Sequence, residues 1–194
     1  MIKILNSGKK DFKIQLNKIL DKRKNKNKTN VNIVKKIIKD LNKNQDRALI
    51  KYEKKFSDNT NIFCNKSKIE KLINKLEPKI KKAIDFSYKR IKKFHSKQKV
   101  RNIYYKDLQK NIFKYKYLPI DSVGIYVPGG NASFPSTVLM NAIPARIAGV
   151  KRIVMVSPAK NGKQSPGVLY AAKKCGIKEI YSIGGAQSIS ALTY

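Results

Sequence analysis

The stretch Val123-Gly124-Ile125-Tyr126-Val127-Pro128-Gly129-Gly130-Asn131 reads as an apolar strand that runs directly into a glycine turn. The same order of residues returns at Ile180-Tyr181-Ser182-Ile183-Gly184-Gly185-Ala186-Gln187. A third apolar run, residues 152–156, lies between them and ends in Ser157-Pro158. Because the three strands begin at residues 123, 152 and 179, each interval of 27 to 29 residues leaves room for one helix. The spacing therefore predicts a repeat of strand and helix.

The segments between these strands carry the signals of helix ends. Residues 136–148 read as a helix that ends at Gly149, and Pro166 opens a second helix that Gly176 closes. Since crossovers between parallel strands are right-handed, we expect an α/β fold with a Rossmann-like parallel βαβαβα sheet, covered by helices. The apolar run of residues 123–127 also predicts a strand that is buried on both faces.

All strands of a parallel sheet end at one edge, so the two glycine turns and Ser157-Pro158 are expected to share a rim where α/β folds bind ligands. Glycine lets the backbone approach a ligand closely, and a helix N-terminus attracts phosphate. The Gln187 side chain can both donate and accept, and Tyr126 can place its ring against a ligand ring. The candidate cofactor-binding residues are Tyr126, Gln187, Gly129, Gly130, Gly184 and Gly185.

The glycine turns match neither of two common nucleotide motifs. Pro128-Gly129-Gly130-Asn131 is not G-x-G-x-x-G, and no acidic residue follows the strand at 152–156 to hold a ribose. No Gly-Lys-Ser or Gly-Lys-Thr of a P-loop follows the glycines. The residues alone thus predict an α/β domain with a nucleotide-like ligand at its rim, while the alternative is that the glycines only make tight turns.

The first 120 residues are polar and have the periodicity of helices. Apolar stripes mark helices at residues 11–20, 31–41 and 48–56, and the Lys/Asn run at 22–30 reads as a solvated connector. A capping box, Ser67-Lys68-Ile69-Glu70, predicts the start of a further helix. Pro78 suits the first position of the next one.

A two-residue alternation follows these helices. Residues 100–105 and 111–118 predict a β-hairpin that turns near residues 107–110. Pro119-Ile120-Asp121-Ser122 then breaks the pattern. We expect a helical region with a hairpin at residues 1–120 and the partial Rossmann-like domain at residues 121–194.

The chain carries 44 Lys and Arg against 12 Asp and Glu, a formal net charge of +32. Only six of the basic residues are Arg, which leaves few side chains for bidentate recognition of phosphate or guanine. We interpret the charge as a compositional bias spread over solvated faces, with a basic RNA-binding module as the alternative. Such a module needs exposed aromatic rings. We instead expect at least half of the combined surface of Tyr104, Tyr105, Tyr115 and Tyr117 to be buried against the helices.

Few residues are suited to metal or nucleophilic chemistry. The single histidine, His95, and two distant cysteines, Cys64 and Cys175, cannot make a typical zinc site. Two cysteines are no disulfide framework either, so we expect a cytoplasmic protein. No apolar run approaches the roughly 18 residues of a membrane span, and we expect no membrane partner and no specific nucleic acid.

The residues around both glycine turns resemble the signature of histidinol dehydrogenases. The similarity is dense from Asp121 to Gly130, from Phe134 to Ala145 and from Gly184 to Leu192, and weaker at residues 44–56 and 94–98. The family usually has Gly-Asp where this chain has Gln45-Asp46. We interpret that departure as a change at a helix start without chemical meaning.

The resemblance implies a zinc-dependent, homodimeric enzyme that oxidises L-histidinol to L-histidine in two NAD-linked steps. It implies that Tyr126 and Gln187 contact NAD. It also implies that the zinc ligands and the catalytic Glu-His pair lie beyond residue 194, because family chains are about twice as long. We therefore expect an N-terminal fragment that is inactive by itself, with a stand-alone nucleotide-binding half as another alternative.

Overall fold

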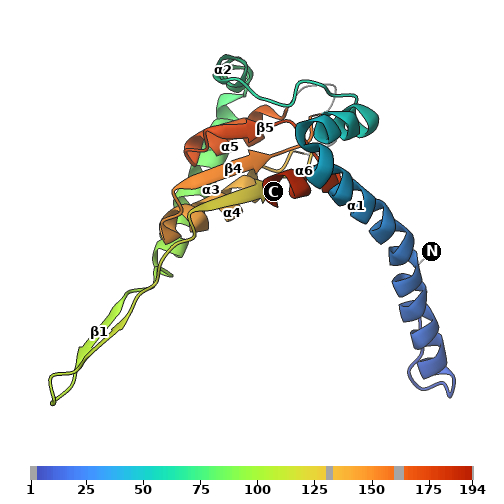
Figure 1. Cartoon of the computed structure of the whole chain (residues 1–194), viewed down its shortest axis with the longest axis horizontal. Helices are drawn as coiled ribbons and strands as arrows, with labels where there is room; N and C mark the ends of the chain where they lie inside the picture. The colour runs from blue at the N-terminus through green and yellow to red at the C-terminus, as the bar shows by residue number, and fades with distance from the viewer. Residues whose placement is uncertain (1–3, 130–132, 160–163, 194) are drawn as a thin grey trace.

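The computed structural model describes residues 4–129, 133–159 and 164–193, with side chains described outside residues 22–29 (Figure 1). Its elements, in chain order, are α1 (Phe12–Ser57), α2 (Lys66–Asn74), α3 (Pro78–Ser96), β1 (Ile103–Lys106), β2 (Ile112–Tyr115), β3 (Ser122–Tyr126), α4 (Pro135–Ala148), β4 (Arg152–Val156), α5 (Pro166–Lys174), β5 (Glu179–Tyr181) and α6 (Gly185–Thr193). No described helix is long and apolar enough to cross a membrane.

The expected parallel sheet is present. Its strand order is β3-β4-β5, and both pairs are parallel. The apolar residues of the central strand β4 are all buried, from Ile153 to Val156. The expectation that the first strand is buried on both faces is wrong, because β3 lies at the edge of the described sheet and leaves Gly124 exposed.

Helices cover both faces of this sheet, as Figure 1 shows. One apolar core joins α2, α3, α4 and α5 to side chains such as Ile125, Ile153 and Met155. A smaller core joins α1 and α6 to Val156 and Ile183. The two strand–helix crossovers therefore bury one side of the sheet, and α1 and α6 cover the other.

The N-terminal helix is longer than the sequence indicated. The Lys/Asn run at residues 22–30 was expected to be a connector, but it is helical and lies within α1. That prediction was wrong because the run contains neither Pro nor Gly, the residues that stop a helix most effectively. Helix α1 is interrupted only at Gln45, whose φ of 45° and ψ of −126° are non-helical.

The next two helices begin near the expected positions. Helix α2 starts at Lys66, and the side chain of Asn65 accepts the Lys68 N–H at 2.8 Å. The predicted capping box at Ser67 is therefore wrong by two residues, because Asn65 supplies the cap and Glu70 instead pairs with Lys173. Helix α3 does begin at Pro78.

The hairpin is confirmed, but its surroundings differ from those expected. Strands β1 and β2 pair antiparallel and project from the body of the molecule (Figure 1). The prediction that at least half of the combined surface of its tyrosines is buried is wrong, since Tyr104, Tyr105, Tyr115 and Tyr117 are 63%, 59%, 59% and 45% exposed. Alternation predicted the strands correctly, but it says nothing about whether a helix lies beside them.

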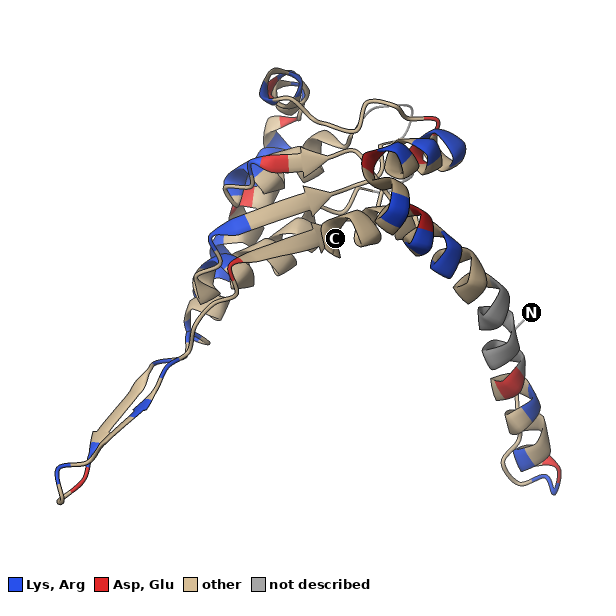
Figure 2. Ribbon diagram, viewed as in Figure 1, with Lys and Arg blue, Asp and Glu red and all other residues tan. Residues whose placement is uncertain are grey.

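The basic residues are scattered, as expected from compositional bias. Figure 2 shows Lys and Arg along the helices and the hairpin, whereas the carboxyl ends of β3, β4 and β5 are largely free of them. Residues 122–129 and 182–193 contain neither Lys nor Arg. The segments that end in the two glycine turns are thus free of basic residues in a very basic chain, while Lys160 and Lys163, which follow β4, lie outside the described residues.

Candidate functional site

The carboxyl ends of the three parallel strands form one surface, which we call the glycine rim (residues 127–129, 157–159 and 182–187). The ladder continues into it, because the Val127 N–H donates to Val156 O at 2.9 Å and the Ser157 N–H to Tyr181 O at 3.0 Å. The rim contains four of the predicted site residues, Gly129, Gly184, Gly185 and Gln187. A fifth, Tyr126, is the last residue of β3 and lies beside them. Gly130 lies outside the described residues.

Pro158 lies between Gly129 and Gly184 in space and explains why both of these positions need glycine. A Cβ at Gly129 would lie 2.5 Å from the Pro158 carbonyl oxygen, and one at Gly184 would lie 2.3 Å from Pro158 Cγ. Neither contact is possible for a real side chain. The alternative left open by the sequence, that these glycines serve the backbone itself, is therefore supported at Gly129 and Gly184.

Gly185 differs from those two glycines, because it joins the two candidate side chains. Its φ of +63° favours glycine, and a Cβ there would lie 2.7 Å from Gln187 Oε1. Its N–H donates to the hydroxyl of Tyr126 at 3.4 Å. Tyr126 and Gln187, 61 positions apart in the sequence, thus meet across one exposed glycine.

Gln187 is buried, with 2% of its surface exposed, and is held by a residue that the sequence analysis missed. Its Nε2 donates to Glu53 Oε1 at 2.7 Å, and the Gly184 N–H donates to the same oxygen at 2.9 Å. Glu53 is fully buried. A signal was available, because Glu53 falls four residues after Leu49, in the apolar stripe of residues 48–56.

A second buried polar group lies beside this one. Gln164 Nε2 donates to Ser157 O at 3.0 Å and to Ser182 Oγ at 3.1 Å. The same Ser182 hydroxyl lies 3.0 Å from Cys64 Sγ. The backbone carbonyl of Ser182 accepts a hydrogen bond from Asn59 Nδ2 at 2.7 Å. These bonds join the ends of β4 and β5 to residues 59–64, so polar side chains hold the strand ends of the rim in place.

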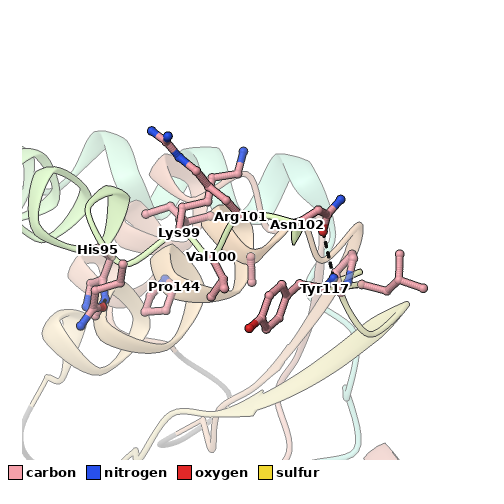
Figure 3. A pocket seen from close by; sticks show the side chains of 12 residues that line it. His95, Lys99, Val100, Arg101, Asn102, Tyr117 and Pro144 are labelled. Carbon is pink, nitrogen blue, oxygen red and sulfur yellow. Dashed lines mark hydrogen bonds between the residues drawn. The ribbon is translucent and has the colours of Figure 1, made fainter. Parts of the chain in front are cut away.

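The only histidine lies elsewhere. His95 lines a pocket of about 660 Å³ between the end of α3, the base of the hairpin and the end of α4 (Figure 3). Its Nδ1 and Gln98 Oε1 are 2.6 Å apart. Pro119 and Ala148, which precede β3 and β4, also line this pocket, so it is at the amino edge of the sheet. The structure does not bring His95 to the glycine rim.

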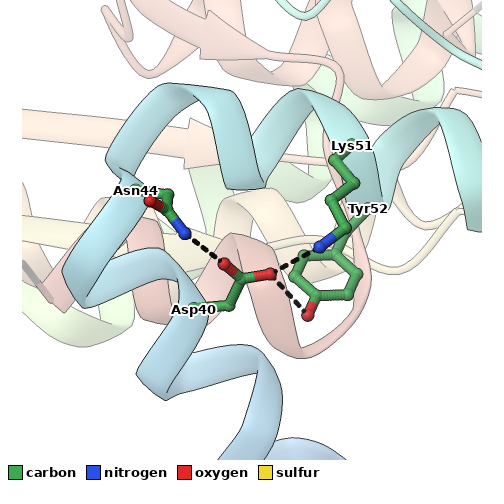
Figure 4. Close-up of polar contacts among 4 residues, drawn as sticks. All are labelled: Asp40, Asn44, Lys51 and Tyr52. Carbon is green, nitrogen blue, oxygen red and sulfur yellow. Dashed lines mark hydrogen bonds and ion pairs between the residues drawn. The ribbon is translucent and has the colours of Figure 1, made fainter.

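The residues where α1 bends form a further polar cluster (Figure 4). Asp40 accepts hydrogen bonds from Lys51 Nζ at 2.9 Å, Asn44 Nδ2 at 2.6 Å and Tyr52 OH at 2.9 Å. The hydrogen bond from Lys51, with those from Asn44 and Tyr52, lowers the pKa of Asp40 to about 2. This cluster spans the interruption at Gln45 and ties the two segments of α1 together.

Metal-binding groups are scarce in the described part of the chain. Residues 4–129, 133–159 and 164–193 contain no group of three or more His, Cys, Asp and Glu side chains that could hold a metal ion. Both cysteines are free and buried. Burial raises the pKa of the Cys175 thiol to about 11, against a smaller opposing effect of Arg146. Cys175 is therefore a neutral apolar side chain.

Comparisons with known proteins agree on one family. The family model described as histidinol dehydrogenase matches residues 20–194. The histidinol dehydrogenase of Pelagibacter ubique is 58% identical over the whole chain, which spans 45% of that relative. That of Caldanaerobacter subterraneus is 43% identical over 92% of the chain and 42% of the relative.

A solved structure shows the same fold. The crystal structure of histidinol dehydrogenase from Elizabethkingia anophelis matches with a TM-score of 0.79 and 38% identity. The match covers 84% of this chain and 38% of that one. The chain thus spans less than half the length of each of these relatives.

Proposed function

The chain belongs to the histidinol dehydrogenase family, and we propose that it supplies the NAD-binding part of a protein that oxidises L-histidinol to L-histidine in histidine biosynthesis. The observation that carries this proposal is the junction at Gly185, where Tyr126 and the Gln187 amide meet on the glycine rim. We assign nucleotide binding to residues 121–194 and place the boundary with the helical region at residues 120 and 121.

Each residue of the rim has a part in this proposal. Tyr126 supplies a ring and a hydroxyl for the nucleotide, and Gln187 supplies a polar group over Gly185. Gly129 and Gly184, which Pro158 requires to be small, let the ends of the three strands pack closely. Hydride acceptance in the two oxidation steps is the chemistry that bound NAD supplies.

Zinc does not fit the described residues, because they contain no suitable cluster of ligands. We therefore derive no step through a metal from this chain. The zinc ligands and the acid–base residues of the family reaction remain predicted for a part of the full-length protein beyond residue 194. The location in the cytoplasm stays a prediction that rests on the cysteines.

A homodimer would use the two segments that project from the body. The N-terminal part of α1 and the hairpin point away from the sheet (Figure 1). Both expose apolar side chains, among them Ile14, Ile33, Tyr105 and Phe113. We propose that protein surface covers these side chains in the assembled enzyme, either in the partner subunit or in the rest of the chain.

The exposed tyrosines of the hairpin also favour a second function. Lys114 and Lys116 alternate with Phe113, Tyr115 and Tyr117 there, and Lys114 Nζ lies 5.6 Å from the Tyr104 ring centre. Such a surface can bind a polyanion or RNA by counterion release and stacking. Sub-micromolar, sequence-preferring RNA binding at physiological salt would favour it, and weak binding that salt abolishes would count against it.

The NAD proposal is tested by Gln187→Ala and Tyr126→Ala in the protein as its gene encodes it. Each variant loses one neutral hydrogen bond or ring contact, so NAD affinity should fall by roughly five- to thirty-fold, about 1 to 2 kcal/mol, with less effect on histidinol. Gln98→Ala, at the amino edge, is the matched control and should bind NAD normally. Unchanged NAD affinity in both rim variants would show that the site is misplaced.

A separate experiment tests whether these 194 residues catalyse the reaction by themselves. We expect the 194-residue chain to bind no stoichiometric zinc and to form no NADH with histidinol, because its described residues lack a metal cluster. Metal analysis and NADH absorbance measure both quantities. Turnover above background by the purified chain would contradict the assignment of catalysis to a further segment.

A further inference from the structure

Glu53 is a buried acid that contacts the glycine rim from another element. It lies on α1, and its Oε1 accepts from the Gly184 N–H at 2.9 Å and from Gln187 Nε2 at 2.7 Å. The other oxygen, Oε2, is buried and has no hydrogen-bond partner among the described residues. A fully buried carboxyl group is costly unless its hydrogen bonds compensate for lost water, so both bonds to Oε1 constrain their donors.

These bonds decide which end of the Gln187 amide is free. Glu53 Oε1 already accepts the Gly184 N–H, so the amide atom that faces it is the NH2 group. The amide oxygen is then left on the side of Gly185, where a Cβ would lie 2.7 Å from it. Gln187 is 2% exposed, and no side chain of the exposed Gly185 lies between that oxygen and the surface.

The same bonds use two backbone N–H groups at the start of α6. A helix N-terminus binds anions through its free backbone N–H groups. At α6 the Gly184 N–H is used by Glu53 and the Gly185 N–H by the Tyr126 hydroxyl. A nucleotide therefore meets the amide oxygen of Gln187 at this end of the rim, where two of the nearby backbone N–H groups are already engaged.

We propose that Glu53 is a positioning residue for Gln187, fixing its amide so that the oxygen accepts from a neutral donor of the nucleotide, a hydroxyl or an amine. This inference rests on the NAD function proposed above. In this inference the fully buried Glu53 does not touch the ligand and affects its binding only through Gln187.

The first experiment needs no ligand. In the protein as its gene encodes it, the Gln187 side-chain NH2 should show strong protection from hydrogen exchange by NMR. Glu53→Met, which keeps the volume but removes the acceptor, should abolish that protection, and Glu53→Gln, which keeps an acceptor oxygen, should retain it. An unprotected NH2 in the unmodified protein, or full protection in Glu53→Met, overturns the proposal even if another variant fails to fold.

The second experiment is a double-mutant cycle with NAD. Glu53→Met alone should weaken NAD binding by roughly five- to thirty-fold, while in the Gln187→Ala background it should change affinity by less than about two-fold. If Glu53 has a purely structural role, the fold-losses in NAD affinity of the two single variants should multiply in the double variant, and that result overturns the proposal. Glu179→Met is the matched control, because Glu179 accepts two hydrogen bonds from Arg152 near the opposite edge and should leave NAD affinity unchanged.

A ligand variant separates the adenine amine from the other neutral donors of NAD. Nicotinamide hypoxanthine dinucleotide lacks the adenine amine. If that amine is the donor, this analogue should bind the unmodified protein as weakly as NAD binds Gln187→Ala; if a hydroxyl or the carboxamide NH2 is the donor, Gln187→Ala should weaken both ligands equally. If Gln187→Ala changes neither affinity, the ligand contact and the NAD site are both wrong, and the exchange experiment still decides whether Glu53 holds the amide.

Discussion

The glycine rim and the β1–β2 hairpin place tyrosines in opposite surroundings. At the rim, Tyr126 is half-buried, packs with the apolar core of α1 and α6, and accepts a hydrogen bond from Gly185. On the hairpin, Tyr104 and Tyr115 are mostly exposed. The difference lies in what covers each strand, because α1 and α6 lie over the face of the sheet that carries Tyr126, whereas the side chains of the hairpin are exposed. Burial at the rim therefore depends on a tertiary contact with α1 and α6.

The largest effect is expected where the rim is packed most tightly. Gly184→Ala would place a Cβ 2.3 Å from Pro158 Cγ. Overpacking of this kind should lower the free energy of unfolding by about 1 to 3 kcal/mol, measured by chemical denaturation. Gly8→Ala is the control, since its nearest contact would be 3.4 Å away. Equal stability of the two variants would show that the rim adapts as freely as the surface.

A substitution at the bend of α1, where the projecting N-terminal part of the helix joins the body, should increase stability. Gln45 has φ 45° and ψ −126°, a conformation that glycine adopts without strain. Gln45→Gly should therefore raise the free energy of unfolding by about 1 kcal/mol. Asp58→Gly, at φ 46° and ψ 38°, is the matched control and should gain less, because Asp tolerates the left-handed region. A loss of stability in Gln45→Gly would contradict the assignment of strain to this residue.

A smaller effect at the same bend should depend on pH. The pKa of Asp40 is lowered from 3.8 to about 2, so its contribution to stability is complete above pH 4. That contribution should be lost as the pH falls through 2, because the protonated acid no longer favours the folded state. Asp40→Asn should flatten this part of the stability profile in denaturation measured between pH 4 and pH 2. An identical profile in both proteins would show that Asp40 is not tied to Lys51 in solution.

The smallest change in stability is expected on the hairpin. Tyr104→Ser and Phe113→Ser remove side chains that are already exposed. They should alter the free energy of unfolding of the 194-residue chain by less than about 0.5 kcal/mol. If protein covers the hairpin in the full-length enzyme, the same substitutions should weaken its assembly in sedimentation experiments. A large loss of stability in the isolated chain would mean that the hairpin packs on the body after all.

Part of the candidate site followed from the sequence for clear reasons. The strand spacing and glycine turns placed Tyr126, Gly129, Gly184 and Gln187 on one edge, because parallel strands all end on the same side. The partner of Gln187 did not follow, because Glu53 is 134 positions away and belongs to another element. The departure at Gln45 was interpreted as a change at a helix start. Only the structure shows that Gln45 has a positive φ, a conformation that favours glycine.

The sequence by itself determined the parallel sheet, its helices, the hairpin and the family, since these depend on local periodicity, on turn residues and on motifs contiguous in the chain. Only the tertiary structure decided that α1 is one long helix through residues 22–30, that Pro158 requires glycine on both sides, and that the hairpin is exposed. It also decided that Glu53 holds Gln187. These features depend on contacts between distant segments, and such contacts leave no period in the sequence.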